Sequence, residues 1–326
     1  MTRRRLALAT ALALVAAGLG VASPATAART PVDQTTRVVV KWKGERQRQV
    51  QQKSANVPGI GRIDLVCRPT STMVRVRPTS RSPETQMWLA KFEQKGGRDV
   101  VAVKNVRVYT GTGSRAHEGL NQRSPIEDFS SGTAYGVISQ RPGRDQAGGG
   151  ALTTPVTSFR LTWWWERFRH PGNEFCRMAL KLRTRSDGQF GLTWHGTDEA
   201  LTHTTSITTV PGLGEAIVTC EPGSTAYDQT VAFRPTGAHP ESAYLDVEYI
   251  QGEGAVDDHV ERYSGLGYDP VTGLLGPVDL PRNGMMRLWV SVDGVQRAYV
   301  LSSYHVVNND RDPRLNLCEV AAAPLP

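Results

Sequence analysis

The sequence lacks most of the signatures by which enzymes and metal-binding proteins are recognised. Only four of its 326 residues are cysteine, and none lies in a CxxC pair or beside a histidine. GxSxG and SxxK motifs are absent. The string that begins at His117 resembles the zinc motif HExxH, but Asn121 occupies the position of the second histidine. We therefore expect no metal, no cofactor and no catalytic residue from a known motif.

Long apolar runs are equally scarce. The one long run, residues 6–22, follows three arginines and precedes the small residues Ala25 and Ala27. That order is typical of a secretory signal peptide cleaved after Ala27. The alternative is a retained membrane anchor, for which the run is short. An even number of cysteines suits an oxidising compartment. We expect a signal peptide at residues 1–27 and a secreted, extracellular protein with no membrane span in the mature chain.

The first part of the chain has few acidic residues, and the second part has few basic ones. Residues 28–188 hold 28 Lys and Arg but only 13 Asp and Glu, which gives a net charge of +15. Residues 189–326 hold 18 Asp and Glu, seven Arg and no Lys, which gives −11. Three interpretations remain open: the two parts dock on each other, each part faces a different partner, or two solvated surfaces have drifted apart. In the second interpretation the basic part binds an anionic polymer.

A repeated cassette defines the organisation of the chain. Residues 57–61 read VPGIG and precede Cys67 by six residues, and residues 210–214 read VPGLG and precede Cys220 in the same way. Cys176 and Cys318 each lie in a short apolar run late in their copy. The repeat therefore predicts the disulfides Cys67–Cys176 and Cys220–Cys318. It also predicts two tandem units, a basic one at residues 28–186 and an acidic one at residues 187–326.

Local patterns favour strands throughout. Runs of β-branched and aromatic residues are separated by Gly, Pro, Asn and Asp, and no convincing amphipathic helix follows the apolar N-terminal run. Asp293-Gly294 between two valines indicates a tight hairpin turn. We expect an all-β protein of two duplicated β-sandwich domains, each closed by one disulfide. They are immunoglobulin-like in architecture only, because the cysteines lie too far apart for an antibody domain.

The repeat also predicts which side chains face the core. Trp88 and Ala90 align with apolar residues in 243–249, whereas Met87 and Leu89 align with Tyr and Asp there. We therefore expect Trp88 and Ala90 to point inward and Met87 and Leu89 to face solvent or a partner.

Three consecutive tryptophans are the most unusual local feature. Alternation along a strand places Trp163 and Trp165 on the core face and Trp164 on the opposite face, together with Arg160 and Glu166. An exposed tryptophan beside a cation is suited to stacking on a sugar ring. The alternative is that Trp164 packs under a loop or against the second unit.

The predicted function is binding or structural rather than catalytic. We expect a secreted protein of the bacterial cell envelope or extracellular space, with arginine in large excess over lysine as in GC-rich bacteria. Its basic unit would bind an anionic cell-wall polymer or a glycan. The alternative is a secreted hydrolase with its site in the groove between the two units. Acid pairs occur at residues 127–128 and 257–258, but adjacent acids in a loop are usually solvated, whereas a glycosidase needs two carboxylates close together across a cleft. A third class would bind a partner protein through long loops of the first unit. The candidate binding residues are Lys41, Lys43, Arg75, Arg77, Arg160 and Trp164.

Overall fold

The structure is a computed structural model in which nearly every described residue belongs to a β-strand. It describes residues 32–44, 50–68, 71–111, 119–123, 129–141, 148–152, 154–166, 168–195, 204–220, 229–237, 240–250, 260–306 and 316–326. Within those ranges there is one 3₁₀ turn, η2 (Pro171–Asn173), and no α-helix. No helix in them is long and apolar enough to cross a membrane. The predicted all-β class is confirmed, while the predicted signal peptide lies outside the described residues.

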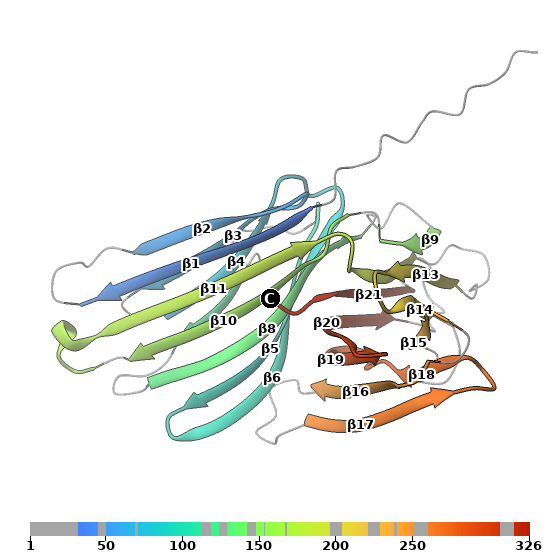
Figure 1. The fold of residues 1–326 in the computed structure, drawn as a ribbon. Coiled ribbons are helices and arrows are strands. Elements are labelled where there is room, and N and C mark those ends of the chain that lie inside the picture. The colour runs from blue at the N-terminus through green and yellow to red at the C-terminus, as the bar shows by residue number, and fades with distance from the viewer. Residues whose placement is uncertain are drawn as a thin grey trace, which may run out of the picture. The chain divides into compact units, whose positions relative to one another are not determined.

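The strands form three antiparallel sheets (Figure 1). The six-stranded sheet has the order β1 (Asp33–Lys43), β11 (Phe175–Arg185), β10 (Thr157–Glu166), β8 (Phe129–Arg141), β5 (Glu84–Lys95) and β6 (Arg98–Val108). The four-stranded sheet has the order β2 (Gln51–Val57), β3 (Gly61–Arg68), β4 (Ser71–Pro78) and β7 (Gly119–Arg123). The eleven-stranded sheet has the order β13 (Thr204–Val210), β14 (Gly214–Cys220), β15 (Gln229–Pro235), β18 (Leu274–Asp279), β17 (Val260–Asp269), β16 (Ala243–Ile250), β19 (Asn283–Val292), β20 (Val295–Val306), β21 (Leu317–Pro324), β12 (Phe190–His195) and β9 (Gly148–Ala151).

Three apolar cores hold these sheets. The first lies between the six-stranded and four-stranded sheets and includes Ile63, Leu89 and Trp165. The second lies within the eleven-stranded sheet, where strands such as β14 and β20 contribute to one cluster around Phe190 and Tyr299. The third joins residues of the six-stranded sheet to residues of the eleven-stranded sheet. Its members include Trp88, Ala90, Val137, Met285, Val300 and Ala321.

Two disulfides connect strands that are distant in sequence. Cys67 on β3 is bonded to Cys176 on β11, which links the four-stranded sheet to the six-stranded sheet. Cys220 on β14 is bonded to Cys318 on β21. These are the two pairs that the repeat predicts. The loops that they close span 109 and 98 residues, long enough for each bond to lower the entropy of the unfolded chain substantially.

The repeated cassette forms the same turn in both places. It connects β2 to β3 and β13 to β14, and glycine is required where each following strand begins. A Cβ atom on Gly61 would lie 2.2 Å from the carbonyl oxygen of Arg77, and one on Gly214 would lie 2.1 Å from that of Arg234. The φ angles of these glycines are +153° and +123°. The cassette therefore serves the fold, because only glycine admits so close an approach of two backbones.

The facing predicted for β5 is wrong. Met87 and Leu89 belong to the first core, whereas Trp88 and Ala90 belong to the third. Both faces of β5 are buried, so polarity does not reveal which face points where. Leu245 and Val247 belong to the second core, so the alignment of Trp88 and Ala90 with them exchanges the two faces of the strand.

Candidate functional site

Trp164 lies on the outer face of the six-stranded sheet. Alternation along β10 buries Trp163 and Trp165, which are 9% and 0% exposed, while Trp164 is 51% exposed. Arg160 on the same face is also exposed. The strand therefore presents an aromatic ring and a guanidinium to solvent, because its other face contributes to the first core.

The register of the sheet places cations in rows beside Trp164. Lys41 on β1 lies opposite Arg177 on β11, which lies opposite Trp164 on β10. Neighbouring strands are about 4.8 Å apart, so the three side chains form one row across the sheet. Figure 1 shows these strands side by side in the order β1, β11, β10.

A second row of cations lies four residues away from the first along the same strands. Arg37 lies opposite Lys181, Lys181 lies opposite Arg160, and Arg160 lies opposite Tyr135 of β8. The guanidinium carbon of Arg160 is 5.7 Å from the centre of the Tyr135 ring. At about 3.4 Å per residue, the two rows are about 14 Å apart along the strands. We call the six residues Arg37, Lys41, Arg160, Trp164, Arg177 and Lys181 the basic face.

The five cations of the basic face are exposed and form no ion pair with any carboxylate among the described residues. Glu166 lies beside the face, and its Oε2 atom accepts a hydrogen bond from Nε1 of Trp164 at 3.4 Å. Lys43 extends the face at the end of β1, where it lies opposite Phe175. The positive charge is therefore available to an external anion.

Three residues of this face were missed from the sequence. Arg37, Arg177 and Lys181 alternate with buried neighbours such as Met178 and Leu180, so their outward direction is legible from the pattern of polarity along each strand. Their proximity to Trp164 is not legible, because it depends on the pairing of strands that are far apart in sequence.

The structure does not bring Arg75 and Arg77 to the basic face. Both lie on β4 of the four-stranded sheet and bind Asp64, whose side chain is 0% exposed. Nη2 of Arg75 and Nε of Arg77 each lie 2.9 Å from Oδ2 of Asp64, and Ser54 donates a hydrogen bond to Oδ1 at 2.7 Å. A buried carboxylate requires such partners. These two arginines therefore stabilise Asp64.

A second cluster of charges lies between the six-stranded and eleven-stranded sheets. Arg141 of β8 binds Glu84 of β5 at 2.5 Å and lies 3.4 Å from Glu319 of β21. Its Nη1 atom also contacts Nε2 of His195. Arg107 of β6 pairs with the same Glu84. We call Glu84, Arg107, Arg141, His195 and Glu319 the buried charge cluster.

The pKa values of the two acids in the buried charge cluster are shifted in opposite directions. Burial raises the pKa of Glu319 to about 7, although Arg141 and a hydrogen bond from Ser139 favour its charged form. Burial also opposes ionisation of Glu84, but the hydrogen bond from Arg107 and the charge of Arg141 outweigh it and lower the pKa. A pair of acids with separated pKa values can indicate a catalytic site. Here Glu84 and Glu319 are 1% and 2% exposed, so a substrate cannot reach them.

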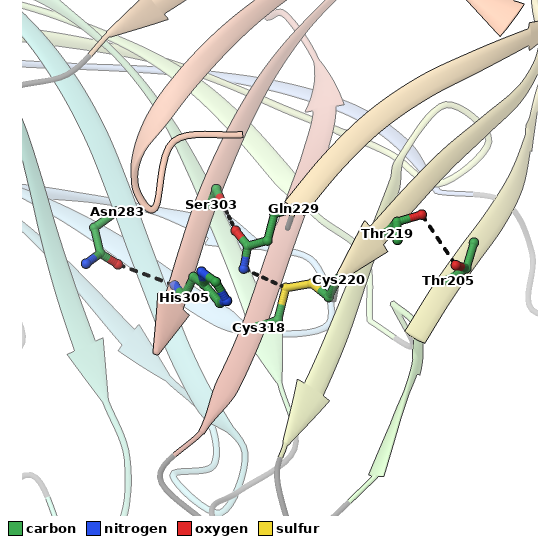
Figure 2. Close-up of a disulfide and its surroundings, with 8 residues drawn as sticks. All are labelled: Thr205, Thr219, Cys220, Gln229, Asn283, Ser303, His305 and Cys318. Carbon is green, nitrogen blue, oxygen red and sulfur yellow. Dashed lines mark hydrogen bonds between the residues drawn. A yellow bond between two sulfur atoms is a disulfide. The ribbon is translucent and has the colours of Figure 1, made fainter. Parts of the chain in front are cut away.

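Among the described residues around the Cys220–Cys318 disulfide, the serine and the histidine drawn in Figure 2 are buried. Gln229 donates a hydrogen bond to Sγ of Cys318 at 3.1 Å and accepts one from Ser303 at 3.1 Å. The backbone amide of His305 donates to Asn283 at 3.3 Å. Ser303 and His305 are 0% and 2% exposed. The network around the disulfide therefore orients buried polar groups.

Neither a candidate metal site nor the acid pairs fall within the described part of the chain. No group of three or more His, Cys, Asp or Glu side chains there could hold a metal ion. His117 and the acid pairs 127–128 and 257–258 lie outside the described residues. Comparison with families of known proteins, with curated proteins and with solved structures finds no match for this chain.

Proposed function

We propose that this protein is a secreted, non-catalytic binding or structural protein that holds an anionic polymer or an acidic glycan on its basic face. The observation that carries the proposal is the row Lys41, Arg177 and Trp164, which three strands contribute in register. Two cations beside an exposed ring suit a polymer that alternates phosphate or carboxylate groups with sugar or polyol units. A cell-wall polymer of the bacterial envelope has this chemistry.

The second row supports a repeating ligand. Because Arg160 and Lys181 lie about 14 Å from the Trp164 row, an extended polyanion that lies along the strands can contact both rows. Five exposed cations that form no ion pair with a described carboxylate would release counterions on binding, so the affinity would depend strongly on salt.

We further propose that the chain consists of two tandem duplicated β-sandwich units, at residues 28–186 and 187–326. The strand order supports this: β1-β11-β10-β8-β5-β6 corresponds to β12-β21-β20-β19-β16-β17, and β2-β3-β4-β7 corresponds to β13-β14-β15-β18. The disulfides join corresponding strands, β3 to β11 and β14 to β21. The cassette turns also correspond.

The two units are proposed to dock through the third core and the buried charge cluster. Apolar residues such as Trp88 and Met285 are buried in this contact, so the hydrophobic effect stabilises it in addition to any attraction between the opposite net charges. The hydrolase alternative requires an open groove at the same place. Arg141, Glu84 and Glu319 fill it with mutually paired charges, which favours a structural contact.

The test is binding to polyanions that differ in backbone but carry one negative charge per repeating unit. We expect the purified protein to bind poly(glycerol phosphate) and polygalacturonate in isothermal titration calorimetry, and not to bind neutral dextran. The logarithm of the association constant should fall linearly with the logarithm of the salt concentration. Binding of dextran as tight as that of the polyanions, or an affinity that does not change with salt, would contradict the proposal.

A matched pair of variants separates the basic face from net charge. Arg177→Gln and Arg98→Gln each remove one exposed positive charge, but Arg98 lies on β6 outside the basic face. Arg177→Gln should weaken polyanion binding about tenfold, and Arg98→Gln should change it much less. Equal effects of the two substitutions would show that only total charge matters.

A further inference from the structure

A pocket of about 290 Å³ opens between the six-stranded and four-stranded sheets. It lies beside β5, β6, β4 and β7, on the inner side of the six-stranded sheet and therefore opposite the basic face. Most of its lining is apolar, and three lysines complete it. The lining residues are Thr72, Met73, Val74, Leu89, Lys91, Lys95, Lys104, Leu120, Ala134, Leu161, Trp163 and Met178.

The pocket exists because two edge strands do not pair. β6 is the last strand of the six-stranded sheet and β7 the last of the four-stranded sheet. At the corresponding place in the eleven-stranded sheet, β17 and β18 are hydrogen-bonded through Tyr268–Leu275 and Asp269–Leu274. Tyr249, Leu266 and Tyr268 pack against the core there. The space between β6 and β7 is therefore open, whereas the corresponding β17 and β18 are joined by hydrogen bonds.

The three lysines point into the space between the sheets, where a sandwich ordinarily places apolar side chains. Along β5, Lys91 and Lys95 share the face of the buried residues Met87 and Leu89. Lys104 of β6 lies opposite Leu89. A lysine on an inward face is costly unless a negative group accompanies it.

One of the three charges has an internal partner. Lys91 pairs with Glu93, and Glu93 also accepts a hydrogen bond from Ser130 at 2.5 Å. Ser130 in turn accepts one from Nε1 of Trp163 at 2.8 Å. Neither Lys95 nor Lys104 forms an ion pair with a carboxylate in the described part of the chain. The pocket therefore combines apolar walls with two positive charges that no described carboxylate compensates.

We propose that this pocket binds a free medium-chain fatty acid, with the alkyl chain between Met73, Leu161 and Met178 and the carboxylate at Lys95 and Lys104. The apolar lining matches the chain, and the lysines match the anionic head. A volume of about 290 Å³ lies at the lower end of small-molecule pockets, which span roughly 300–1,000 Å³, so it suits a medium-chain acid better than a long-chain one. An acid with a chain of about ten carbon atoms fits that space. The site is independent of the polymer-binding face.

Methionine methyl resonances test the site without any substitution. In protein labelled with ¹³C at the methionine methyls, decanoate should shift the signals of Met73 and Met178, which line the pocket. The signals of Met285 and Met286 should stay in place, because these residues belong to the other two cores. No shift at saturating decanoate, or equal shifts of all four signals, would overturn the proposal.

Variants and analogues test the role of charge. Lys104→Met should weaken decanoate binding about tenfold in calorimetry, and the double variant with Lys95→Met more strongly. Lys53→Met removes an exposed lysine of β2 outside the pocket and should have no effect. Decanol should bind more weakly than decanoate, and decyltrimethylammonium should not bind. If Lys104→Met and Lys53→Met retain equal affinity, or if the cationic analogue binds as well as decanoate, the assignment is wrong.

The source of the acid is tested with vesicles. Because the pocket suits a single medium-length chain, we expect any cosedimentation with vesicles of phosphatidylglycerol and phosphatidylcholine to come from the basic face, and therefore to be unchanged in Lys104→Met. Cosedimentation that is lost in Lys104→Met would overturn the free-acid assignment in favour of a membrane lipid. Should the lysine variants fold poorly, Leu120→Trp provides a second route, because it fills the pocket from a half-buried position and should abolish decanoate binding.

Discussion

Nη2 of Arg141 lies 2.5 Å from Oε2 of Glu84, and both side chains are 1% exposed. The ion pair joins β8 to β5, and both strands also contribute residues to the third core. Glu319 of β21 faces the same guanidinium at 3.4 Å, so one arginine connects acids of two different sheets. Buried charged side chains such as these are tolerated in a folded protein only when each has a partner of opposite charge, because burying an unpaired charge is very costly.

Removing Arg141 should therefore destabilise the protein strongly. In Arg141→Met the side chain retains much of its volume, but Glu84 and Glu319 lose a shared partner. We expect the free energy of unfolding to fall by about 3–5 kcal/mol. The measurement is denaturant unfolding under oxidising conditions, followed by tryptophan fluorescence.

Arg185→Met is the control for Arg141→Met. Arg185 pairs with Asp187 at 2.6 Å, but both side chains are partly exposed, at 28% and 41%. Solvent screens such a pair, so its loss should cost less than about 1 kcal/mol. Equal effects of the two substitutions would mean that the buried charge cluster contributes nothing beyond a surface ion pair.

The raised pKa of Glu319 predicts a loss of stability between pH 5 and pH 8. The folded protein retains the Glu319 proton up to about pH 7, whereas the unfolded chain loses it near its ordinary pKa of 4.5. In this window the folded state binds more protons, so the free energy of unfolding decreases as pH rises. We expect the contribution of this group to be about 1–3 kcal/mol. Glu84 acts in the opposite direction, because its lowered pKa removes stability only as pH falls below 4.5.

Glu319→Gln tests the titration directly. The amide retains a similar shape and can accept the hydrogen bond from Ser139, but it carries no charge at any pH. The variant should gain stability relative to the parent protein as pH rises from 5 to 8, measured by denaturant unfolding at several pH values. Parallel stability curves for the two proteins would show that Glu319 does not change its protonation state in this range.

Two neighbouring tryptophans should respond in opposite ways to substitution. Trp164→Ala removes an exposed ring, so it should leave stability within about 0.5 kcal/mol and weaken polyanion binding about tenfold. Trp165→Ala removes a ring that is 0% exposed and should lower the free energy of unfolding by about 3–5 kcal/mol. Thermal unfolding and calorimetric titration of both variants distinguish these outcomes. Unchanged polyanion binding in Trp164→Ala would remove this residue from the proposed site.

The cassette glycines should be intolerant of any side chain. In Gly214→Ala the new Cβ would meet the backbone of Arg234 and Thr236, so we expect a loss of about 3–4 kcal/mol of stability. Gly237 also has a positive φ, at +96°, but nothing lies within 4 Å of its Cβ position. Gly237→Ala should therefore cost only the conformational strain, about 1 kcal/mol. Similar losses in the two variants would show that backbone contact is not the reason for the glycine.

Several features of the fold can be predicted from the sequence because they depend on neighbouring residues. Asp293 and Gly294 form the predicted hairpin turn between β19 and β20, with φ angles of 46° and 80° that suit this pair of residues. The outward direction of Trp164 follows from the period of two along a strand. The repeat leads to both disulfide pairs because corresponding cysteines occupy corresponding strands.

The candidate site was only partly predictable. Lys41, Arg160 and Trp164 were selected from charge and alternation, and the structure places them on one face. Arg75 and Arg77 were selected for the same reason, but they bind Asp64 on the four-stranded sheet. Charge alone does not distinguish an arginine that is free to bind a ligand from one that compensates a buried acid.

The amino-acid sequence by itself determined the β class, the tight turn at Asp293-Gly294 and the facing of side chains on strands with one exposed face, because these follow from backbone sterics and local alternation. Tertiary structure alone decided that Lys41 and Trp164, more than a hundred residues apart, share one row. It also decided that both faces of β5 are buried, and that β6 and β7 leave a pocket open where β17 and β18 close it. Strand register and sheet packing depend on contacts between distant residues, which no local pattern encodes.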